Sequence, residues 1–391
     1  MRKLSADYVF SPEGKFVPKA VITVNSTGEI INFEIPTGDF KETAGLEYYN
    51  GILVPGFINA HCHSELSHMK GVVSPGKALP EFIDEVIKKR NSPDKLKDKI
   101  ARADLEMKAE GIVAVGDISN NSDSFEMKKN SSIYYHTFIE MFITNDTNIA
   151  GLKETARQTK KALNDLPGSF VPHAPYTVSD KLFSTINELN AGESKVISIH
   201  NQETRSEDEL FLSQRGKLYE QMKKIGFNYK DFHFTDKNSL QSTLPKLAKD
   251  KNILLIHNSY TQEADINFAE NYSDSVYWVF CPASNLYIEN QLPNYPLFFN
   301  KKLKTCIGTD SYASNTKLSV IHELKIISEN YPEIDLAKLI NTACINGAKA
   351  LNIEHKYGDF SIGKTPGINL ITGIDYKTMS LSSESDVEAL V

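Results

Sequence analysis

The 391-residue sequence predicts an α/β fold: a (β/α)8 TIM-like barrel with a small β domain built from both chain ends. Two observations support this prediction. Short apolar runs rich in β-branched residues recur along the chain, and segments with helical patterns fill the intervals between them. Strand and helix in alternation are typical of a parallel sheet, and eight such units favour a closed barrel. A doubly wound open sheet is the structural alternative.

The predicted strands follow one another along the middle of the chain. The first lies within residues 54–63, Val-Pro-Gly-Phe-Ile-Asn-Ala-His-Cys-His, and the others are 111–117, 133–139, 170–175, 196–200, 253–257, 276–281 and 305–310. Predicted helices between them include residues 79–89, 96–110, 151–166 and 318–329. In a barrel of this kind, catalytic groups lie at the carboxyl ends of the strands.

The two chain ends carry shorter strand patterns. Residues 21–24 and 29–34 alternate in polarity, and residues 368–372 form a comparable piece near the other end. Neither end has enough strand to fold alone. We therefore expect residues 1–53 and 354–391 to pair into one composite β domain beside a barrel domain of residues 54–353.

Composition narrows the class of partner. Forty-three basic and 50 acidic residues give a net charge of -7, and no dense Lys/Arg stripe is present, which argues against nucleic acid. No stretch has the length of a membrane span or the pattern of a secretory leader. The cysteines form no C-x-x-C pair, which indicates a reducing compartment, and we expect the cytoplasm.

His61 and His63 close the first predicted strand. Side chains on a strand alternate between faces, so these two leave the same face and can bind one metal ion. Imidazole is a preferred ligand of zinc and its neighbours in the first transition row. Alternation turns Cys62 the other way, and we expect Cys62 and Cys281 to serve as packing residues.

Further polar residues fall at the ends of later strands. They are His173 after the fourth strand, His200 and Glu203 at the fifth, His257 at the sixth and Asp310 at the eighth. Scattered surface histidines would not gather at one end of successive strands. The joint pattern therefore predicts a metal site far more strongly than the first pair alone.

Several short motifs, taken in order, carry a resemblance to a known family. They are Pro55 to His63, His-Ala-Pro-Tyr at 173–176, His-Asn-Gln-Glu at 200–203, His257-Asn258, Cys-Pro-Ala-Ser-Asn at 281–285, Gly-Thr-Asp at 308–310, and 341–348. The chain resembles the amidohydrolase superfamily, in its mononuclear branch of purine, nucleoside and triazine aminohydrolases and chlorohydrolases. The resemblance spans nearly the whole chain and implies a barrel with a small β-sandwich domain formed from both termini.

The resemblance implies that His61, His63, His200 and Asp310 bind one divalent metal ion, with water in the remaining position. Zinc is favoured, with iron or manganese as alternatives. Such a metal lowers the pKa of its water, and Asp310 is suited to take the proton. Binuclear relatives carry a bridging lysine at the fourth strand, and residues 168–176 contain none, which favours a single metal.

The remaining roles follow from the same resemblance. Glu203 would shuttle a proton to the substrate, while His257 would either orient the water and polarise the substrate or bind the metal. His173 resembles a substrate-contacting position. Further candidates are Glu65 and His68 for substrate contacts, Arg90, Arg205 and Arg215 for an anionic group, and Asn285 for a structural role.

The leading hypothesis is a metal-dependent hydrolase of non-peptide carbon–nitrogen bonds, an aminohydrolase that deaminates a heteroaromatic, purine- or nucleoside-like amine. A chlorohydrolase or a cyclic amidohydrolase would use the same site. A non-catalytic scaffold that retains the fold is the alternative of a different class. The expected partners are a small-molecule substrate and water, and because relatives often form dimers, a homodimer is one assembly open to this chain.

Overall fold

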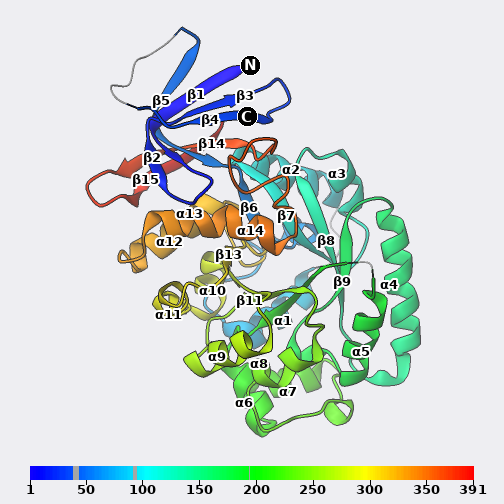
Figure 1. Ribbon diagram of the computed structural model, residues 1–391. Helices are drawn as coiled ribbons and strands as arrows, with labels where there is room; N and C mark the ends of the chain where they lie inside the picture. Colours follow the sequence, from blue (N-terminus) through cyan, green and yellow to red (C-terminus); the bar gives the residue numbers. More distant parts are fainter. Residues whose placement is uncertain (38–43, 91–94, 193) are drawn as a thin grey trace.

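The computed structural model of the chain describes residues 1–37, 44–90, 95–192 and 194–391. Figure 1 shows two parts: a β-sheet that holds both chain ends, and a larger part in which strands are surrounded by helices. The two parts meet along β6, β14 and the helices α12 to α14, whose bounds are given below.

The strands of the larger part follow one another in chain order. They are β6 (Phe57–Cys62), β7 (Ile112–Ser119), β8 (Tyr134–Met141), β9 (Gly168–Pro172), β10 (Val196–Asn201), β11 (Asn252–His257), β12 (Val276–Phe280) and β13 (Thr305–Ile307). They form two parallel four-stranded sheets, β6-β7-β8-β9 and β10-β11-β12-β13. Every residue of β12 is buried, as expected for a parallel strand covered on both faces.

Backbone hydrogen bonds join the two sheets at both edges. On one side Cys62 and Asp310 form a parallel bridge, and the amide of Thr309 donates to the carbonyl of His61 across 3.0 Å. On the other side the amide of His200 donates to the carbonyl of His173, also across 3.0 Å. This arrangement confirms the predicted (β/α)8 barrel and argues against the doubly wound open sheet.

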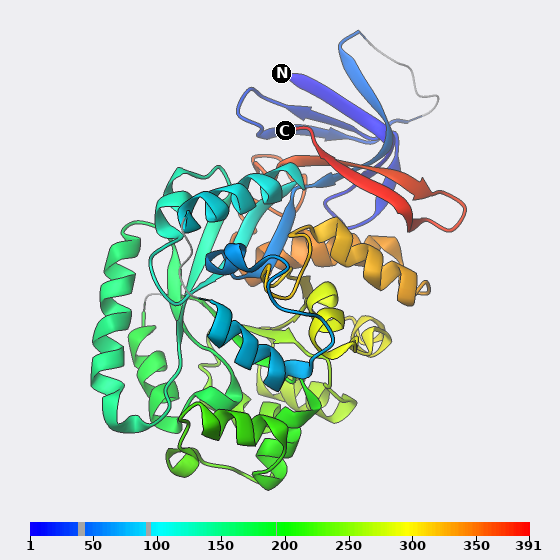
Figure 2. The same ribbon diagram turned by 180° about the vertical axis from the view of Figure 1, so that it is seen from behind.

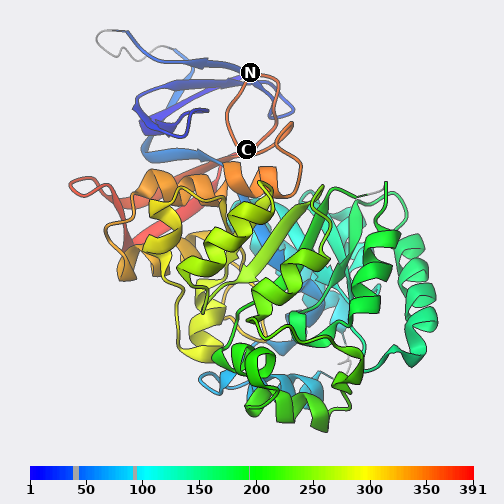
Figure 3. The ribbon, with the colours of Figure 1, turned by 60° about the horizontal axis from the view of Figure 1, so that its bottom comes forward.

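Helices surround the strands (Figure 3). They are α1 (Ala78–Lys89), α2 (Leu96–Ala109), α3 (Phe125–Asn130), α4 (Ile149–Leu163), α5 (Asp180–Leu189), α6 (Arg205–Ser213), α7 (Lys217–Lys224), α8 (Ser239–Thr243), α9 (Glu263–Tyr272), α10 (Pro282–Glu289), α11 (Tyr295–Asn300), α12 (Val320–Asn330), α13 (Leu336–Ala343) and α14 (Ile345–Ala350). Short 3₁₀ helices are η1 (Ser64–Met69), η2 (Asp146–Asn148), η3 (Pro175–Thr177), η4 (Tyr229–Asp231) and η5 (Leu244–Lys246). Serine caps explain several starts: Ser179 accepts from the amide of Leu182 before α5, and Ser319 accepts from that of His322 before α12.

The sheet of the smaller part comes from both chain ends. Its strands are β1 (Arg2–Phe10), β2 (Phe16–Pro18), β3 (Val21–Val24), β4 (Ile30–Glu34), β5 (Leu46–Pro55), β14 (Ile368–Asp375) and β15 (Ser380–Ala389), in the order β15-β14-β5-β1-β3-β4, with β2 paired to β1. It has its own buried core, which includes Leu4, Ile22, Leu53, Phe360 and Leu370. The composite β domain is thereby confirmed, while its limits at residues 53 and 354 stay a prediction.

One predicted strand is two strands. The apolar run at residues 54–63 divides at Gly56, because Val54 and Pro55 pair with β14 in the terminal sheet, whereas Phe57 begins β6 of the barrel. A side chain at residue 56 has no room: a Cβ there would lie 2.3 Å from Cγ1 of Val113. Glycine therefore allows the chain to pass from one sheet into the other.

No helix among the described residues has both the length and the apolar character needed to cross a membrane.

Behind the barrel in Figure 1, and in front of it in Figure 2, α1 lies beside the strand ends. The residues that follow from β6 to α1 therefore stand next to the end of the barrel where the polar residues gather.

Candidate metal and active site

Three imidazoles converge at the carboxyl ends of β6 and β10. Nε2 of His63 lies 3.2 Å from Nε2 of His61 and 3.4 Å from Nε2 of His200. Ligand nitrogens at about 2.0–2.1 Å around a tetrahedral zinc ion stand about 3.3–3.4 Å apart. The spacing of these three nitrogens therefore fits a first-row divalent metal ion, as the sequence predicts for these residues.

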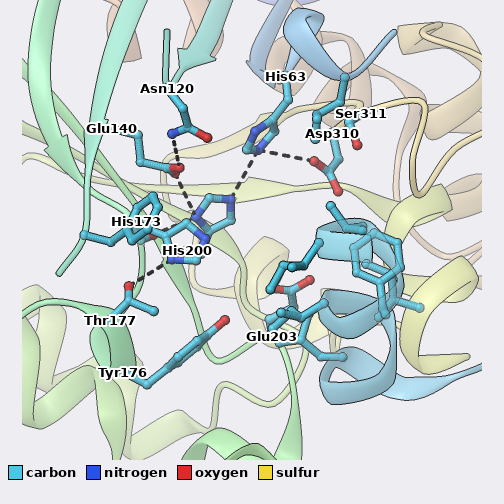
Figure 4. A pocket seen from close by; sticks show the side chains of 18 of the residues that line it. His63, Asn120, Glu140, His173, Tyr176, Thr177, His200, Glu203, Asp310 and Ser311 are labelled. Carbon is cyan, nitrogen blue, oxygen red and sulfur yellow. Dashed lines mark hydrogen bonds and ion pairs between the residues drawn. The ribbon is translucent and has the colours of Figure 1, made fainter. Parts of the chain in front are cut away.

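Asp310 adds an oxygen to the same point. Its Oδ1 lies 3.7 Å from Nε2 of His61 and 3.5 Å from Nε2 of His63. Its other oxygen, Oδ2, accepts hydrogen bonds from the hydroxyls of Ser284 and Ser314, across 2.7 and 2.6 Å. The serines thus occupy one oxygen and leave the other facing the histidines, and Figure 4 shows the pairing of Asp310 with His63.

The protonation states suit a metal ligand set. Burial, together with neighbouring His61, lowers the pKa of His63 to about 3, and burial among other histidines holds that of His200 well below its usual range. Burial acts to raise the pKa of Asp310, but its pairing with His61 and the nearby His63 hold it well below the usual range. Neutral imidazoles and an ionised carboxylate are the forms that bind metal.

Gly308 allows the last barrel strand to approach the first. A Cβ at this position would lie 2.7 Å from Cβ of His61 and 3.0 Å from Sγ of Cys281. Real Cβ atoms do not approach other atoms so closely, so a larger residue would push His61 away. The Gly-Thr-Asp sequence therefore places Asp310 beside the histidines of β6.

Glu203 follows β10 and lines the same cavity as the histidines. Its backbone amide donates to Oε2 of Glu207, across 3.2 Å, and that of Gln202 donates to Oε1, across 3.1 Å. Thr204 then caps α6 through the amide of Ser206. Burial, with the nearby charge of Asp310, raises the pKa of Glu203 well above its usual range, which suits a group that donates a proton.

His257 ends β11 with its two ring nitrogens in different surroundings. Nδ1 lies 2.8 Å from Oδ1 of Asn285, and Nε2 lies 3.6 Å from Oε1 of Glu203. Its φ of 74° is in the left-handed region, and Asp310 has a φ of 55°. Such backbone strain in residues other than glycine is concentrated at functional sites. Asn285, predicted to be structural, holds the His257 ring.

A cavity of about 200 Å³ opens above these residues. One wall is polar and consists of strand-end residues, which include His63, His173, His200, Glu203, His257 and Asp310. The opposite wall is apolar and is formed by Leu79, Phe82, Ile83, Val86 and Ile87 of α1 with Met222, Ile225, Phe227 and Ile288. A mostly apolar lining with a few convergent polar groups is typical of a small-molecule site.

His173 lines the polar wall after β9 (Figure 4). Its Nδ1 lies 2.9 Å from Oγ1 of Thr177, and its ring centroid lies 4.9 Å from that of His200. Burial lowers the pKa of His173 to about 4, which keeps the ring neutral. With Nδ1 occupied by Thr177, Nε2 is the nitrogen left for a ligand.

Most of the other candidate residues lie outside this cavity. Glu65 is buried behind Asn120, and Oε2 of Glu65 accepts a hydrogen bond from the backbone amide of Asn120. His68 lines a separate hollow with Lys70, Lys99 and Arg102. Neither is among the residues that line the cavity, which gives no support to direct substrate contact. Of the three arginine candidates, Arg90 lines the cavity, whereas Arg205 and Arg215 do not. Cys62 and Cys281 are buried, and burial raises the pKa of both thiols.

Two cavity residues were missed in the sequence. Glu140 lies near the end of β8 and Asn120 directly follows β7, and Asn120 Nδ2 donates to Oε2 of Glu140 across 2.8 Å. Burial raises the pKa of Glu140 to about 7. Both occupy strand ends, so the rule that identified the histidines could have found them had the second predicted strand been extended by two residues and the third by one.

A histidine cluster at the carboxyl ends of a (β/α)8 barrel is the architecture of a metal-dependent hydrolase. The model of the amidohydrolase family matches residues 52–389 of this chain, and the chain therefore belongs to the amidohydrolase family.

Several similar proteins are deaminases by name. The chain is 28% identical over 373 residues to a 5'-deoxyadenosine deaminase of Methanococcus vannielii, covering 86% of this chain and 80% of that protein. It is 26% identical over 385 residues to an aminodeoxyfutalosine deaminase of Nitratiruptor, covering 95% and 91%. The crystal structure of Helicobacter pylori aminofutalosine deaminase in complex with methylthio-coformycin has the same fold, with a TM-score of 0.80 and 19% identity over 95% of this chain and 92% of that one.

Proposed function

We propose that this protein is a metal-dependent aminohydrolase that releases ammonia from an adenine nucleoside or a close analogue. The observation that carries the proposal is the convergence of three imidazole nitrogens and Oδ1 of Asp310 beside Glu203 in one small cavity. Membership of the amidohydrolase family and the names of the similar deaminases support the same chemistry.

His61, His63, His200 and Asp310 would hold one divalent metal ion. When bound, such an ion supplies Lewis-acid activation of water near neutral pH. Three imidazoles with one carboxylate favour zinc, and iron and manganese accept the same donors. The described residues form two close groups of donors, His61, His63 and His200, and Glu140, His173 and His200, which share His200. The shared His200 and the absence of a lysine at the end of β9 favour one ion, bound at the first group.

The proton transfers belong to the chain's own residues. The oxygen of the attacking water bonds to the ring carbon that carries the amine, and Asp310 takes a proton from this water. The displaced electron pair moves to the neighbouring ring nitrogen, which takes a proton from Glu203. Asp310 returns its proton to the amine, the carbon–nitrogen bond breaks, and ammonia leaves. The proton of the added hydroxyl passes back to Glu203 as the ring carbonyl forms. Positioned proton transfer of this kind contributes roughly 100- to 10,000-fold in rate.

His257 fits the orienting role better than the ligand role. Asn285 holds its Nδ1, and its Nε2 lies toward Glu203, 3.6 Å away. Its ligand nitrogens do not belong to the close group formed by His61, His63 and His200. We assign His257 to polarising the substrate and orienting the water between Glu203 and Asp310.

The cavity favours a nucleoside over a nucleotide. Arg90 is the single Lys or Arg among the lining residues, and the wall formed by α1 and the segment around α7 is apolar. A phosphate group would need clustered positive charge. An apolar group at the 5' position would bury well there, which agrees with the names of the relatives. His173 would contact the substrate from the polar wall.

The alternatives share the site and differ in the product. A chlorohydrolase would release chloride, and a cyclic amidohydrolase would open a ring. The complete donor set beside Glu203 argues against a non-catalytic scaffold.

A cytoplasmic location agrees with the four free, buried cysteines. The homodimer stays a prediction.

The test is ammonia release by metal-loaded protein from adenosine, 5'-deoxyadenosine and 5'-methylthioadenosine, with a chlorotriazine and a hydantoin as the other arms. We expect ammonia from at least one nucleoside. Glu203→Gln should lower turnover by roughly 100- to 10,000-fold while one metal ion per chain is retained. The matched control is Glu126→Gln, because Glu126 is exposed on α3. No ammonia from any nucleoside would overturn the proposal, and full turnover by Glu203→Gln would overturn the role of Glu203.

A further inference from the structure

Glu140 presents a carboxylate oxygen that the chemistry described above does not use. Its side chain is 3% exposed, and it lines the cavity near the end of β8. Oε2 accepts from Nδ2 of Asn120, but Oε1 is buried and has no hydrogen-bond partner among the described residues. Buried acceptors are normally paired, so an unpaired one in a cavity wall points to a missing donor.

The neighbouring histidine does not supply this donor. Nδ1 of His200 lies 3.7 Å from Oε1 of Glu140, which is too long for a hydrogen bond. That nitrogen lies 2.6 Å from the carbonyl oxygen of His173, and its proton is donated there. Figure 4 shows Glu140 beside His173 and His200 in the cavity wall, with a dashed line for its ion pair with His200. No described residue donates a hydrogen bond to Oε1, which leaves this oxygen for a ligand donor.

Asn120 fixes the direction of this carboxylate. Its backbone amide donates to Oε2 of Glu65 across 2.9 Å, while its side chain donates to Glu140 across 2.8 Å. Asn120 is thus tied between two buried carboxylates and cannot rotate freely. A held acceptor recognises a ligand donor with little loss of conformational freedom.

Glu140 lies away from the reacting ring. Asn120 follows β7 and Glu140 lies near the end of β8, in one four-stranded sheet, whereas Glu203 follows β10 and His257 ends β11 in the other. A purine ring held by Glu203 and His257 would direct the rest of the substrate toward β7 and β8. In a nucleoside that part is the sugar. Arg90 lines the same cavity and disfavours an ammonium group there, whereas a neutral hydroxyl is acceptable.

We propose that Glu140, held by Asn120, is a specificity residue that accepts a hydrogen bond from a sugar hydroxyl of the substrate. The inference rests on the proposed nucleoside deamination, and it adds that Glu140 recognises the sugar of the substrate. Where the 5' position carries no hydroxyl, the donors are the 2'- and 3'-hydroxyls of the ribose.

The first experiment needs only the wild-type enzyme. KM and kcat are measured for adenosine, 2'-deoxyadenosine, 3'-deoxyadenosine and 2',3'-dideoxyadenosine by ammonia release. We expect KM for the dideoxy compound to be at least tenfold higher than for adenosine, with a smaller change in kcat. Equal KM values for all four compounds would overturn the inference.

The second experiment removes the acceptor with Glu140→Gln, and Glu126→Gln serves as the control on an exposed helix. We expect the variant to raise KM for adenosine at least tenfold and to lose discrimination against the dideoxy compound. Equilibrium binding of the same two nucleosides in a Glu203→Gln background gives a second readout without turnover. If Glu140→Gln keeps the wild-type discrimination, the inference is wrong. Absence of ammonia from every nucleoside with the wild-type enzyme would instead overturn the proposed function and this inference together.

Discussion

The hydroxyl of Ser314 donates a hydrogen bond to Oδ2 of Asp310 across 2.6 Å, and both side chains are buried. Ser284 donates to the same oxygen from the start of α10, across 2.7 Å. Two donors on Oδ2 fix the rotation of the carboxylate and leave Oδ1 toward His61 and His63. We therefore expect the serines to act as positioning residues for the proposed metal site.

Ser284→Ala and Ser314→Ala should each weaken metal binding, because partners that orient a ligand typically contribute 10- to 100-fold in affinity. The double variant should lose more than either single variant. Competition with a chromophoric chelator measures the affinity. Ser184→Ala on the exposed face of α5 is the control. Unchanged affinity in the double variant would contradict this role.

Gly308→Ala should displace His61, since the added Cβ would lie 2.7 Å from Cβ of that residue. Overpacking of this kind typically costs about 1–3 kcal/mol in the free energy of unfolding, and the metal content should fall as well. Urea unfolding and metal analysis measure the two effects. Gly151→Ala is the control, because its Cβ would meet only the side chain of Asn148. Wild-type metal content in Gly308→Ala would show that the close approach is not needed.

Lys128 and Asp117 form an ion pair with both side chains fully buried, at 2.6 Å. Asp117 also accepts from the backbone amide and the hydroxyl of Ser64, next to His63. Lys128→Met would leave the carboxylate buried without its partner, at a cost of about 3–5 kcal/mol. Lys97→Met is the control, because its pair with Glu126 is exposed and should be worth about 0–1 kcal/mol. Denaturant unfolding measures both losses in the free energy of unfolding. Equal losses in the two variants would show that the buried pair contributes no more than the exposed one.

The raised pKa of the buried Glu207 predicts that the free energy of unfolding depends on pH. Burial raises its pKa from 4.5 to about 8. The folded state therefore favours the protonated form, so this contribution to stability is complete below the unfolded pKa and is lost as pH rises through the folded pKa. The unfolding free energy should fall from about pH 5 to about pH 8, by up to about 1.4 kcal/mol per pH unit.

Glu207→Gln should flatten this pH profile, and Glu209→Gln on the exposed side of α6 should not. Chemical unfolding at a series of pH values provides the comparison. A profile in Glu207→Gln as steep as that of the wild type would assign the pH dependence to other groups.

Much of the barrel could be predicted because its strands are short, apolar runs at regular spacing. The division of residues 54–63 at Gly56 could not, because both halves of the run are apolar and only their partners differ: β14 for Val54 and β7 for Phe57. The local pattern contains no information about which strand lies alongside. The terminal sheet was predicted in outline for the same reason, without β1, β2, β15 or most of β5.

The histidines and Asp310 could be predicted because strand ends gather at one face of a barrel. Ser284 and Ser314 could not, since a serine in a loop or at a helix start is common and its partner lies far away in the sequence. Glu65 and His68 follow the first strand closely, yet η1 turns them away from the cavity. The apolar wall from α1 required the packing of α1 against α7 and α10, which no local pattern specifies.

The bridge between Cys62 and Asp310 joins residues near the beginning and near the end of the barrel. Because the donors come from β6, β10 and the turn after β13, a nascent chain lacks the full set until its last barrel strand has emerged. A bound ion would then hold the first and the last barrel strands together. Uptake of metal would thereby report that synthesis has passed Asp310 and that the barrel has closed, and a chain truncated before Asp310 should remain without it.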